Sequence, residues 1–168
     1  PEAPQTANSV CLADLRRRVD KGQLSPDAAV AQSFEAIAAR EKDVQAFVCH
    51  ARSAKAQSSG PLRGIAVGIK DIIDTANMPT EMGSEIYCGW QPRADAPVVM
   101  MLKRAGATII GKTTTTARAS REPTPTPNPH NFGHSPGAPS AGSASAAAPG
   151  RPPRALGPPP GCLGRRRR

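Results

Sequence analysis

The chain has few aromatic residues and no long apolar run. Only five of its 168 residues are Phe, Trp or Tyr, and no apolar stretch approaches the ~18 residues that a membrane-spanning helix needs. The first four residues, Pro-Glu-Ala-Pro, lack the basic and apolar segments of a secretory signal. The sequence therefore predicts no membrane association and no secretory signal.

The cysteines lack the spacing of a metal site or a disulfide framework. Cys11, Cys49, Cys88 and Cys162 are widely separated, with no Cys-x-x-Cys pair and no histidine at ligand spacing. Free thiols are the normal state of such cysteines in a reducing compartment. We therefore expect no metal site, and we expect the protein to be cytoplasmic.

Composition divides the chain after Ala117. Residues 1–117 carry 14 Lys and Arg against 12 Asp and Glu, a net charge of +2, whereas residues 118–168 carry 8 Arg against one Glu, a net charge of +7. The second part also holds 12 of the 19 prolines. Its only large apolar side chains are Phe132, Leu156 and Leu163.

Three large apolar side chains cannot build a core for the second part. Burial must offset roughly 1–2 kcal/mol of backbone entropy for each ordered residue. We therefore expect a frayed N-terminus over residues 1–9, a folded part over 10–117, and a disordered basic tail over 118–168.

Apolar spacing in the first part predicts an α/β fold, a sheet covered by helices. Leu12, Leu15 and Val19 recur on one helical face, and Ser25-Pro26 is a typical helix start. The expected helices cover residues 12–22, 25–41 and 95–106, and the expected strands cover 44–49, 64–69 and 108–111. The helix–helix–strand–strand–helix–strand order is typical of α/β proteins.

The third expected helix has a defined start and a defined apolar face. Asp95 is expected to cap it, with Pro97 in its first turn. Its apolar face is predicted to comprise Val98, Met101, Leu102 and Ala105.

Lys70 is the residue of the first part that best fits a chemical role. It directly follows the apolar run of residues 64–69, so we expect it to be at least half buried and within reach of Ser and Thr hydroxyls. Burial lowers the pKa of a lysine, and a neutral amine can act as a base. The alternative is a structural lysine at a strand end that extends to solvent or pairs with an acid.

Several separate blocks of the sequence resemble the amidase signature family. Residues 61–71 read Pro-Leu-Arg-Gly-Ile-Ala-Val-Gly-Ile-Lys-Asp and are similar to the segment that carries the family's catalytic lysine. The resemblance continues, in the same order, through residues 80–84, 95–105, 107–113, 128–131 and 134–137. It is good over residues 10–117 and patchy over 118–164.

The resemblance implies a fold, a reaction and a role for Lys70. Family members hydrolyse or transfer amides with a Ser–cis-Ser–Lys triad, without a cofactor or metal. A lysine acts as base through a bridging serine, and a second serine attacks the carbonyl. The resemblance gives the base role to Lys70, and it implies that this chain is the N-terminal part of such a domain, with an incomplete sheet.

The two serine positions of the triad are substituted in this chain. Counted from Pro136-Gly137, the bridging serine falls on Pro139, with Ser140 as the neighbouring hydroxyl, and the nucleophile position falls on Leu163. Cys162 lies beside that position, but its neighbours offer no base. Runs of Pro, Ala, Gly and Arg in the tail are consistent with a GC-rich gene read out of frame, so the tail is either frame-shifted or divergent.

Three functions follow as hypotheses. The first is hydrolysis of a small carboxamide to a carboxylate and ammonia or an amine, with this chain inactive for want of its nucleophile. The second is an A-type component of a tRNA-dependent amidotransferase, which needs protein partners. The third is a non-enzymatic, basic nucleic-acid-binding protein, supported by the tail that ends in four arginines; against it, the tail has only Phe132 to stack on bases.

Overall fold

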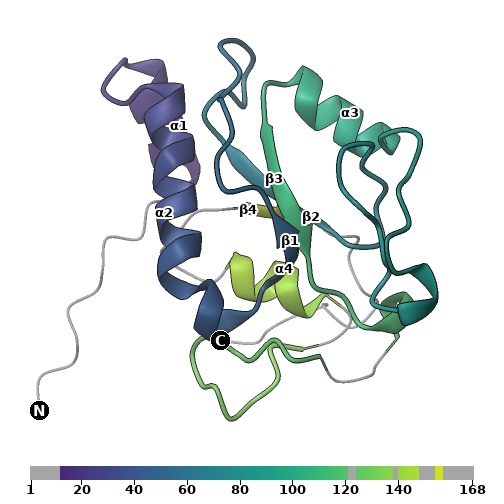
Figure 1. Ribbon diagram of the computed structural model, residues 1–168. Coiled ribbons are helices and arrows are strands. Elements are labelled where there is room, and N and C mark those ends of the chain that lie inside the picture. The colour runs from purple at the N-terminus through teal and green to yellow at the C-terminus, as the bar shows by residue number, and fades with distance from the viewer. Residues whose placement is uncertain (1–11, 121–123, 138–139, 148–153, 157–168) are drawn as a thin grey trace, which may run out of the picture.

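The computed structural model describes residues 12–120, 124–137 and 140–147, together with the backbone of 154–156 (Figure 1). The elements, in chain order, are α1 (Leu12–Asp20), α2 (Pro26–Val44), β1 (Phe47–His50), β2 (Ala66–Lys70), the 3-10 turn η1 (Glu85–Tyr87), α3 (Pro97–Arg104), β3 (Thr108–Thr113), the 3-10 turn η2 (Ala117–Ala119), α4 (Ala141–Ala146) and β4 (Arg154–Leu156). The predicted order of helices and strands in the first part is confirmed.

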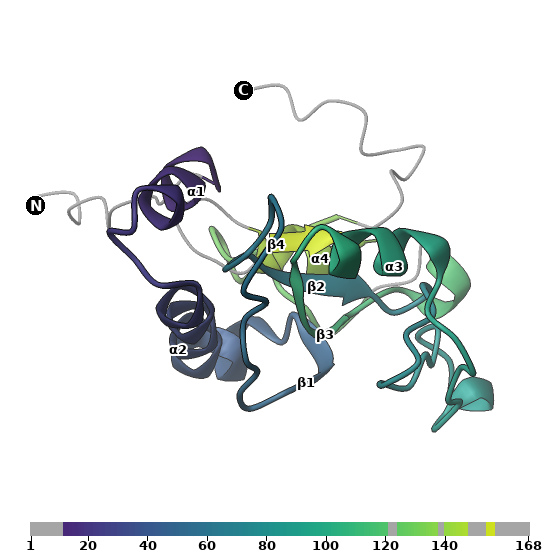
Figure 2. The same ribbon diagram turned by 90° about the horizontal axis from the view of Figure 1, so that it is seen from above.

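The four strands form one mixed sheet in the order β1-β3-β2-β4. Strand β2 runs parallel to β3 and to β4, while β1 is antiparallel to β3. Parallel strands need a crossover, and α3 provides it between β2 and β3. Seen from above, α1 and α2 lie toward one side of the strands, and the loop between β2 and α3 lies toward the other (Figure 2). The fold is therefore mixed α/β, as predicted.

Helix α2 shows how local sequence sets an element. The Ser25 side chain accepts a hydrogen bond from the backbone N–H of Ala28 at 3.1 Å, and Pro26 occupies the first turn. The helix ends at Val44. Its cap, Gln45, has a left-handed φ of 48°, and the Gln45 N–H bonds back to the carbonyl of Glu41. The helix thus runs three residues beyond the predicted end at Glu41.

The predicted cap of α3 is wrong and its predicted apolar face is correct only in part, although Pro97 does lie in the first turn. Ala96 takes the cap position, while the Asp95 carboxylate accepts a hydrogen bond from the N–H of Ala76 at 2.8 Å and pairs with Lys103 at 2.6 Å. Val99, which was not predicted, is the fully buried residue of this helix. Of the predicted face, Leu102 packs partly buried against the core, whereas Met101 is 68% exposed. The helix is therefore rotated relative to the expectation, because the sheet it packs on selects the face that contains Val99.

The tail is more ordered than predicted. Residues 141–146 form α4, which packs against β2, β3 and β4, and residues 154–156 add a fourth strand parallel to β2. Small residues make this packing: a Cβ on Gly142 would lie 2.3 Å from both the carbonyl oxygen of Ala46 and the N–H nitrogen of Thr114. The prediction of a disordered tail considered only large apolar side chains, so it did not detect this packing of small residues. The remainder of the expected tail, residues 121–123, 138–139, 148–153 and 157–168, lies outside the described residues.

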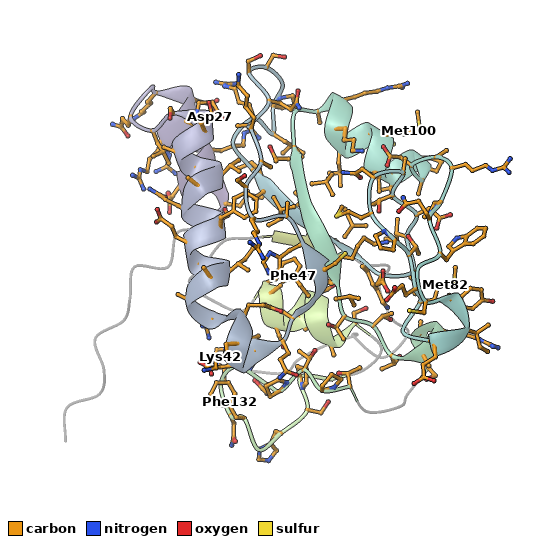
Figure 3. The ribbon with its side chains drawn as sticks, viewed as in Figure 1. Asp27, Lys42, Phe47, Met82, Met100 and Phe132 are labelled. Carbon is orange, nitrogen blue, oxygen red and sulfur yellow. The ribbon has the colours of Figure 1, made fainter. Side chains whose placement is uncertain are left out.

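The core of the described residues is apolar on both faces of the sheet. One cluster includes Leu15, Val67, Ile69 and Val99, and a second joins Ile37 and Ile110, with Phe47 packed against it. Phe47 lies beside the strands in Figure 3. In the part of the chain that the structure describes, no helix has the length and apolar content needed to cross a bilayer.

Candidate active site

Lys70 lies at the end of β2 with 1% of its surface exposed. Both faces of β2 are covered, so every residue of the strand is buried. Burial lowers the pKa of Lys70, because the charged ammonium loses its hydration. The prediction that this lysine is buried at a strand end is confirmed; its catalytic role stays a prediction.

The Lys70 amine has no side-chain partner among the described residues: it makes neither a hydrogen bond nor an ion pair with them. The hydroxyl contact expected from the sequence is therefore not found as a hydrogen bond. A buried amine without an acceptor is uncommon, because desolvation of an uncompensated ammonium is costly. The neutral amine is the form that this environment favours.

Strand β3 and helix α4 provide hydroxyl groups on the side of the sheet that Lys70 faces. Lys70 is the register partner of Thr113. A Cβ on Gly68, two residues before Lys70 and so on its face of the strand, would lie 2.8 Å from the methyl of Thr113. The Thr113 Oγ1 in turn shares a hydrogen bond of 2.7 Å with the Ser143 Oγ. Lys70 therefore faces the side of the sheet that carries Thr113 and α4.

Ser140 precedes α4 and is 3% exposed, and its Oγ has no hydrogen-bond partner in the described part of the chain. The hydroxyl of Ser145, on the same helix, is engaged by the carbonyl of Pro127 at 3.0 Å. The substituted triad positions Pro139 and Leu163, and also Cys162, lie outside the described residues.

A second buried lysine, Lys112, was not singled out from the sequence. Lys112 is 0% exposed, and its Nζ meets three acceptors: Thr80 Oγ1 at 2.5 Å, the Pro79 carbonyl at 3.1 Å and Asp71 Oδ1 at 3.3 Å. It also follows an apolar strand, at residues 108–111, and that shared position was the signal that could have identified it. The contacts with Thr80 and Pro79 are hydrogen bonds, whereas the contact with Asp71 is an ion pair without hydrogen-bond geometry, so the charge of this amine is compensated.

Asp71 links the ion pair to the loop that follows β2. Its Oδ2 accepts a hydrogen bond from the N–H of Glu81 at 3.2 Å, and its carbonyl accepts one from the N–H of Met82 at 3.0 Å. Met82 is labelled in this loop in Figure 3. Burial raises the pKa of Asp71 and lowers the pKa of Lys112, and each charge opposes the shift of the other.

The described residues contain no group of three or more His, Cys, Asp or Glu side chains arranged to hold a metal ion. Cys49 and Cys88 are free thiols, the first partly buried and the second exposed. Cys11 and Cys162 lie outside the described ranges.

Comparisons with known proteins agree with this architecture. The amidase family model matches residues 27–158. The chain is 36% identical over 157 residues to the A-type subunit of glutamyl-tRNA(Gln) amidotransferase from Halothermothrix orenii, covering 86% of this chain and 32% of that protein.

Two solved structures share the fold. The structure of the A-type subunit of glutamyl-tRNA(Gln) amidotransferase from Thermotoga maritima aligns with a TM-score of 0.66 and 30% identity, covering 83% of this chain and 33% of that one. The peptide amidase of Stenotrophomonas maltophilia aligns with a TM-score of 0.68 and 27% identity, covering 86% and 34%. The chain thus spans about a third of the length of the relatives it matches. With the family model matching residues 27–158, this chain belongs to the amidase family.

Proposed function

We propose that the parent reaction of this chain is hydrolysis of a carboxamide to a carboxylate and ammonia or an amine, with Lys70 as the base. The observation that carries the proposal is the Lys70 amine, buried at a strand end and without any acceptor among the described residues. A lysine kept for structure is normally paired, as Lys112 is. Membership of the amidase family supports the reaction type.

The chemistry follows from the protonation state of Lys70. A neutral amine takes a proton from a bridging hydroxyl, which takes one from the attacking serine, and the alkoxide adds to the amide carbonyl. Collapse of the adduct expels the amine with a proton, and water then releases the carboxylate. In this chain Ser140 is a stand-in for the bridging serine, because its hydroxyl is buried and has no partner in the described part.

We further propose that the 168-residue chain is itself inactive. Leu163 occupies the position where the family resemblance expects the nucleophile, and Pro139 occupies that of the bridging serine. Leu and Pro have no hydroxyl to attack or to relay a proton. Triad members act as a unit, so losing one removes nearly all of their shared effect on rate.

A second candidate function is that of an A-type subunit in a tRNA-dependent amidotransferase. It is favoured by the relatives that carry the name of this component of glutamyl-tRNA(Gln) amidotransferase. In that case, the amide chemistry would serve transfer to a tRNA-bound acceptor, and the chain would work with protein partners. A cytoplasmic location fits both candidates and is supported by the free thiols at Cys49 and Cys88.

The nucleic-acid-binding hypothesis has weaker support. Its basis is the positive charge of the tail, and the four terminal arginines lie outside the described residues. Filter binding of RNA and DNA across a salt series separates specific binding from a charge effect, since sequence-blind binding by arginines falls steeply with salt.

The test of the hydrolase proposal compares two forms of the protein. The chain as it stands is assayed with short aliphatic and aromatic carboxamides at pH 7–9, and we expect no turnover above background. A version in which a one-base change in the coding DNA restores a Gly-Gly-Ser-like turn and the full-length domain should hydrolyse them. In that version Lys70→Ala should abolish activity, whereas Lys55→Ala, at an exposed lysine, should leave it unchanged. Activity in the restored form that survives Lys70→Ala contradicts the proposal.

A further inference from the structure

The two buried lysines lie on adjacent strands of the sheet but have opposite surroundings. Lys70 ends β2 and shares its face with Thr113 and α4. Lys112 is the register partner of Ile69, the residue before Lys70, and its amine is bound by the loop that follows β2. Successive residues of a strand point to opposite faces, so the two amines lie on different sides of the sheet.

Asp71 is the carboxylate nearest to Lys70 along the chain. Its two oxygens are directed elsewhere: Oδ1 lies 3.3 Å from Lys112 Nζ, and Oδ2 accepts the N–H of Glu81 at 3.2 Å. Its backbone N–H bonds to the carbonyl of Thr113 at 3.0 Å, which fixes the chain direction at the end of β2. With Asp71 held in this way, its carboxylate makes no ion pair with Lys70.

We propose that Lys112 is a positioning residue for Lys70: by binding the Asp71 carboxylate on one side of the sheet, it keeps that negative charge neutralised and away from the Lys70 amine on the other side. The inference rests on the proposed role of Lys70 as base, since a base must be kept free of a permanent counter-ion. An uncompensated carboxylate one residue away in this buried setting would favour the charged form of Lys70 through its electrostatic field, without direct contact.

Few other charges face Lys70. The segment of α4 is Ala-Gly-Ser-Ala-Ser-Ala and carries no titratable group. From β3 the charged residue is Lys112 itself. From the loop after β2 the acids are Glu81, which lies near Asp71 and opposes its ionisation, and Asp74, whose charge favours the ionised form of Lys112. On β1 His50 is exposed, and on β4 Arg154 is described by its backbone alone, in register with Val67. Burial alone lowers the pKa of Lys70 in the wild-type protein, as expected when the paired charges of Asp71 and Lys112 offset each other.

The experiment titrates Lys70 directly in the 168-residue chain. The protein has six lysines, so their side-chain carbon resonances can be followed by NMR from pH 6 to 11, and Lys70→Arg assigns the resonance of interest. Lys112→Gln keeps polar contacts to Thr80 and Pro79 but removes the charge. We expect it to raise the titration midpoint of Lys70 by about one unit, because Asp71 is then uncompensated.

The matched variants separate charge from loosening of the fold. Asp71→Asn leaves the Lys112 ammonium uncompensated and should lower the Lys70 midpoint by about one unit, and the double variant should return it close to the wild-type value. A loosened structure hydrates Lys70 and raises its midpoint in both single variants. Lys103→Met, which removes the partly exposed pair with Asp95, should leave the Lys70 midpoint unchanged.

The outcomes are decisive in each case. Opposite shifts in Lys112→Gln and Asp71→Asn support the inference, and equal shifts of one sign, or none, overturn it. Should Lys112→Gln not fold, Asp71→Asn carries the test alone, because its expected shift is opposite to that of loosening. A wild-type Lys70 that titrates at the ordinary value of 10.5 contradicts the proposed base instead, so the two failures are told apart.

Discussion

Lys112 and Lys70 are both buried, on opposite sides of the sheet, but their amines have different surroundings. Lys112 is matched by one carboxylate, one hydroxyl and one carbonyl, so the ammonium is compensated where it lies. Lys70 meets no acceptor among the described residues; its register partner is Thr113, whose hydroxyl shares a hydrogen bond with Ser143 of α4. The surroundings of Lys112 stabilise its charged form, and those of Lys70 disfavour the charged form.

The difference indicates which lysine the fold uses for stability. Breaking a buried ion pair such as Lys112–Asp71 lowers stability strongly, because removing one partner leaves the other charged and desolvated. An unpartnered buried amine stabilises nothing in its charged form, so its retention needs another reason, and perturbed groups of this kind concentrate at functional sites. We therefore expect the two lysines to respond differently to the same substitution.

The largest effect is expected at Lys112. Lys112→Met leaves the Asp71 carboxylate buried and unpaired, and we expect the free energy of unfolding to fall by about 3–5 kcal/mol, measured by urea denaturation. The control is Lys103→Met, which removes a partly exposed pair with Asp95 at 2.6 Å and should cost less than about 1 kcal/mol. Equal losses in the two variants would mean that the buried pair adds no more than a surface one.

A second large effect is expected where α4 meets the sheet. In Gly142→Ala the new methyl would lie 2.3 Å from the backbone of Ala46 and of Thr114, neither of which can move freely. We expect a loss of about 1–3 kcal/mol in the same denaturation experiment. In the control Gly133→Ala, the methyl would meet only the Asn131 Oδ1, at 3.3 Å, and should be close to neutral. A neutral Gly142→Ala would show that α4 does not pack as closely as described.

Sequence reasoning succeeded where structure is set locally. The start of α2 depends on Ser25 and Pro26, and β2 depends on a continuous apolar run, so neighbouring residues contain the needed information. The same apolar run identified Lys70 as buried. The predicted face of α3 was only partly correct: Leu102 packs against the core, but Val99 instead of Met101 is buried, because the sheet determines which side of the helix is covered.

The misses near the site have a common cause, which is contact between residues distant in the chain. Lys112 and Asp71 are brought together by the pairing of β2 with β3, which no local pattern specifies. The order of α4 depends on Gly142 fitting against Thr114, a contact of small residues that a count of apolar side chains does not detect. The roles of Ser140 and Lys70 in catalysis stay predictions.

Substitution of Lys70 is expected to have a smaller effect on stability, and to raise it instead of lowering it. The folded-state pKa of Lys70 is lowered, so between that value and the ordinary one of 10.5 the unfolded chain binds a proton that the folded chain does not. This group's contribution to stability is therefore complete above pH 10.5 and is lost as the pH falls from there through the folded pKa. Lys70→Met should raise the melting temperature at pH 7 by roughly a few degrees, and the gain should shrink as the pH approaches 10. A lower melting temperature at pH 7 contradicts an uncompensated amine.

The smallest effects on stability are expected at two buried serines of the α4 segment, Ser140 and Ser143. Ser143→Ala removes the partner of the Thr113 hydroxyl and should cost about 1 kcal/mol. Ser140→Ala removes a buried hydroxyl that has no partner among the described residues, so we expect a change within about 0.5 kcal/mol or a slight gain. Both are measured by urea denaturation at pH 8. The comparison requires that the dependence of unfolding free energy on urea concentration has the same slope in both variants. A loss at Ser140 as large as that at Ser143 would mean that its hydroxyl is already engaged, and Ser140 would then lose its support as the stand-in for the bridging serine.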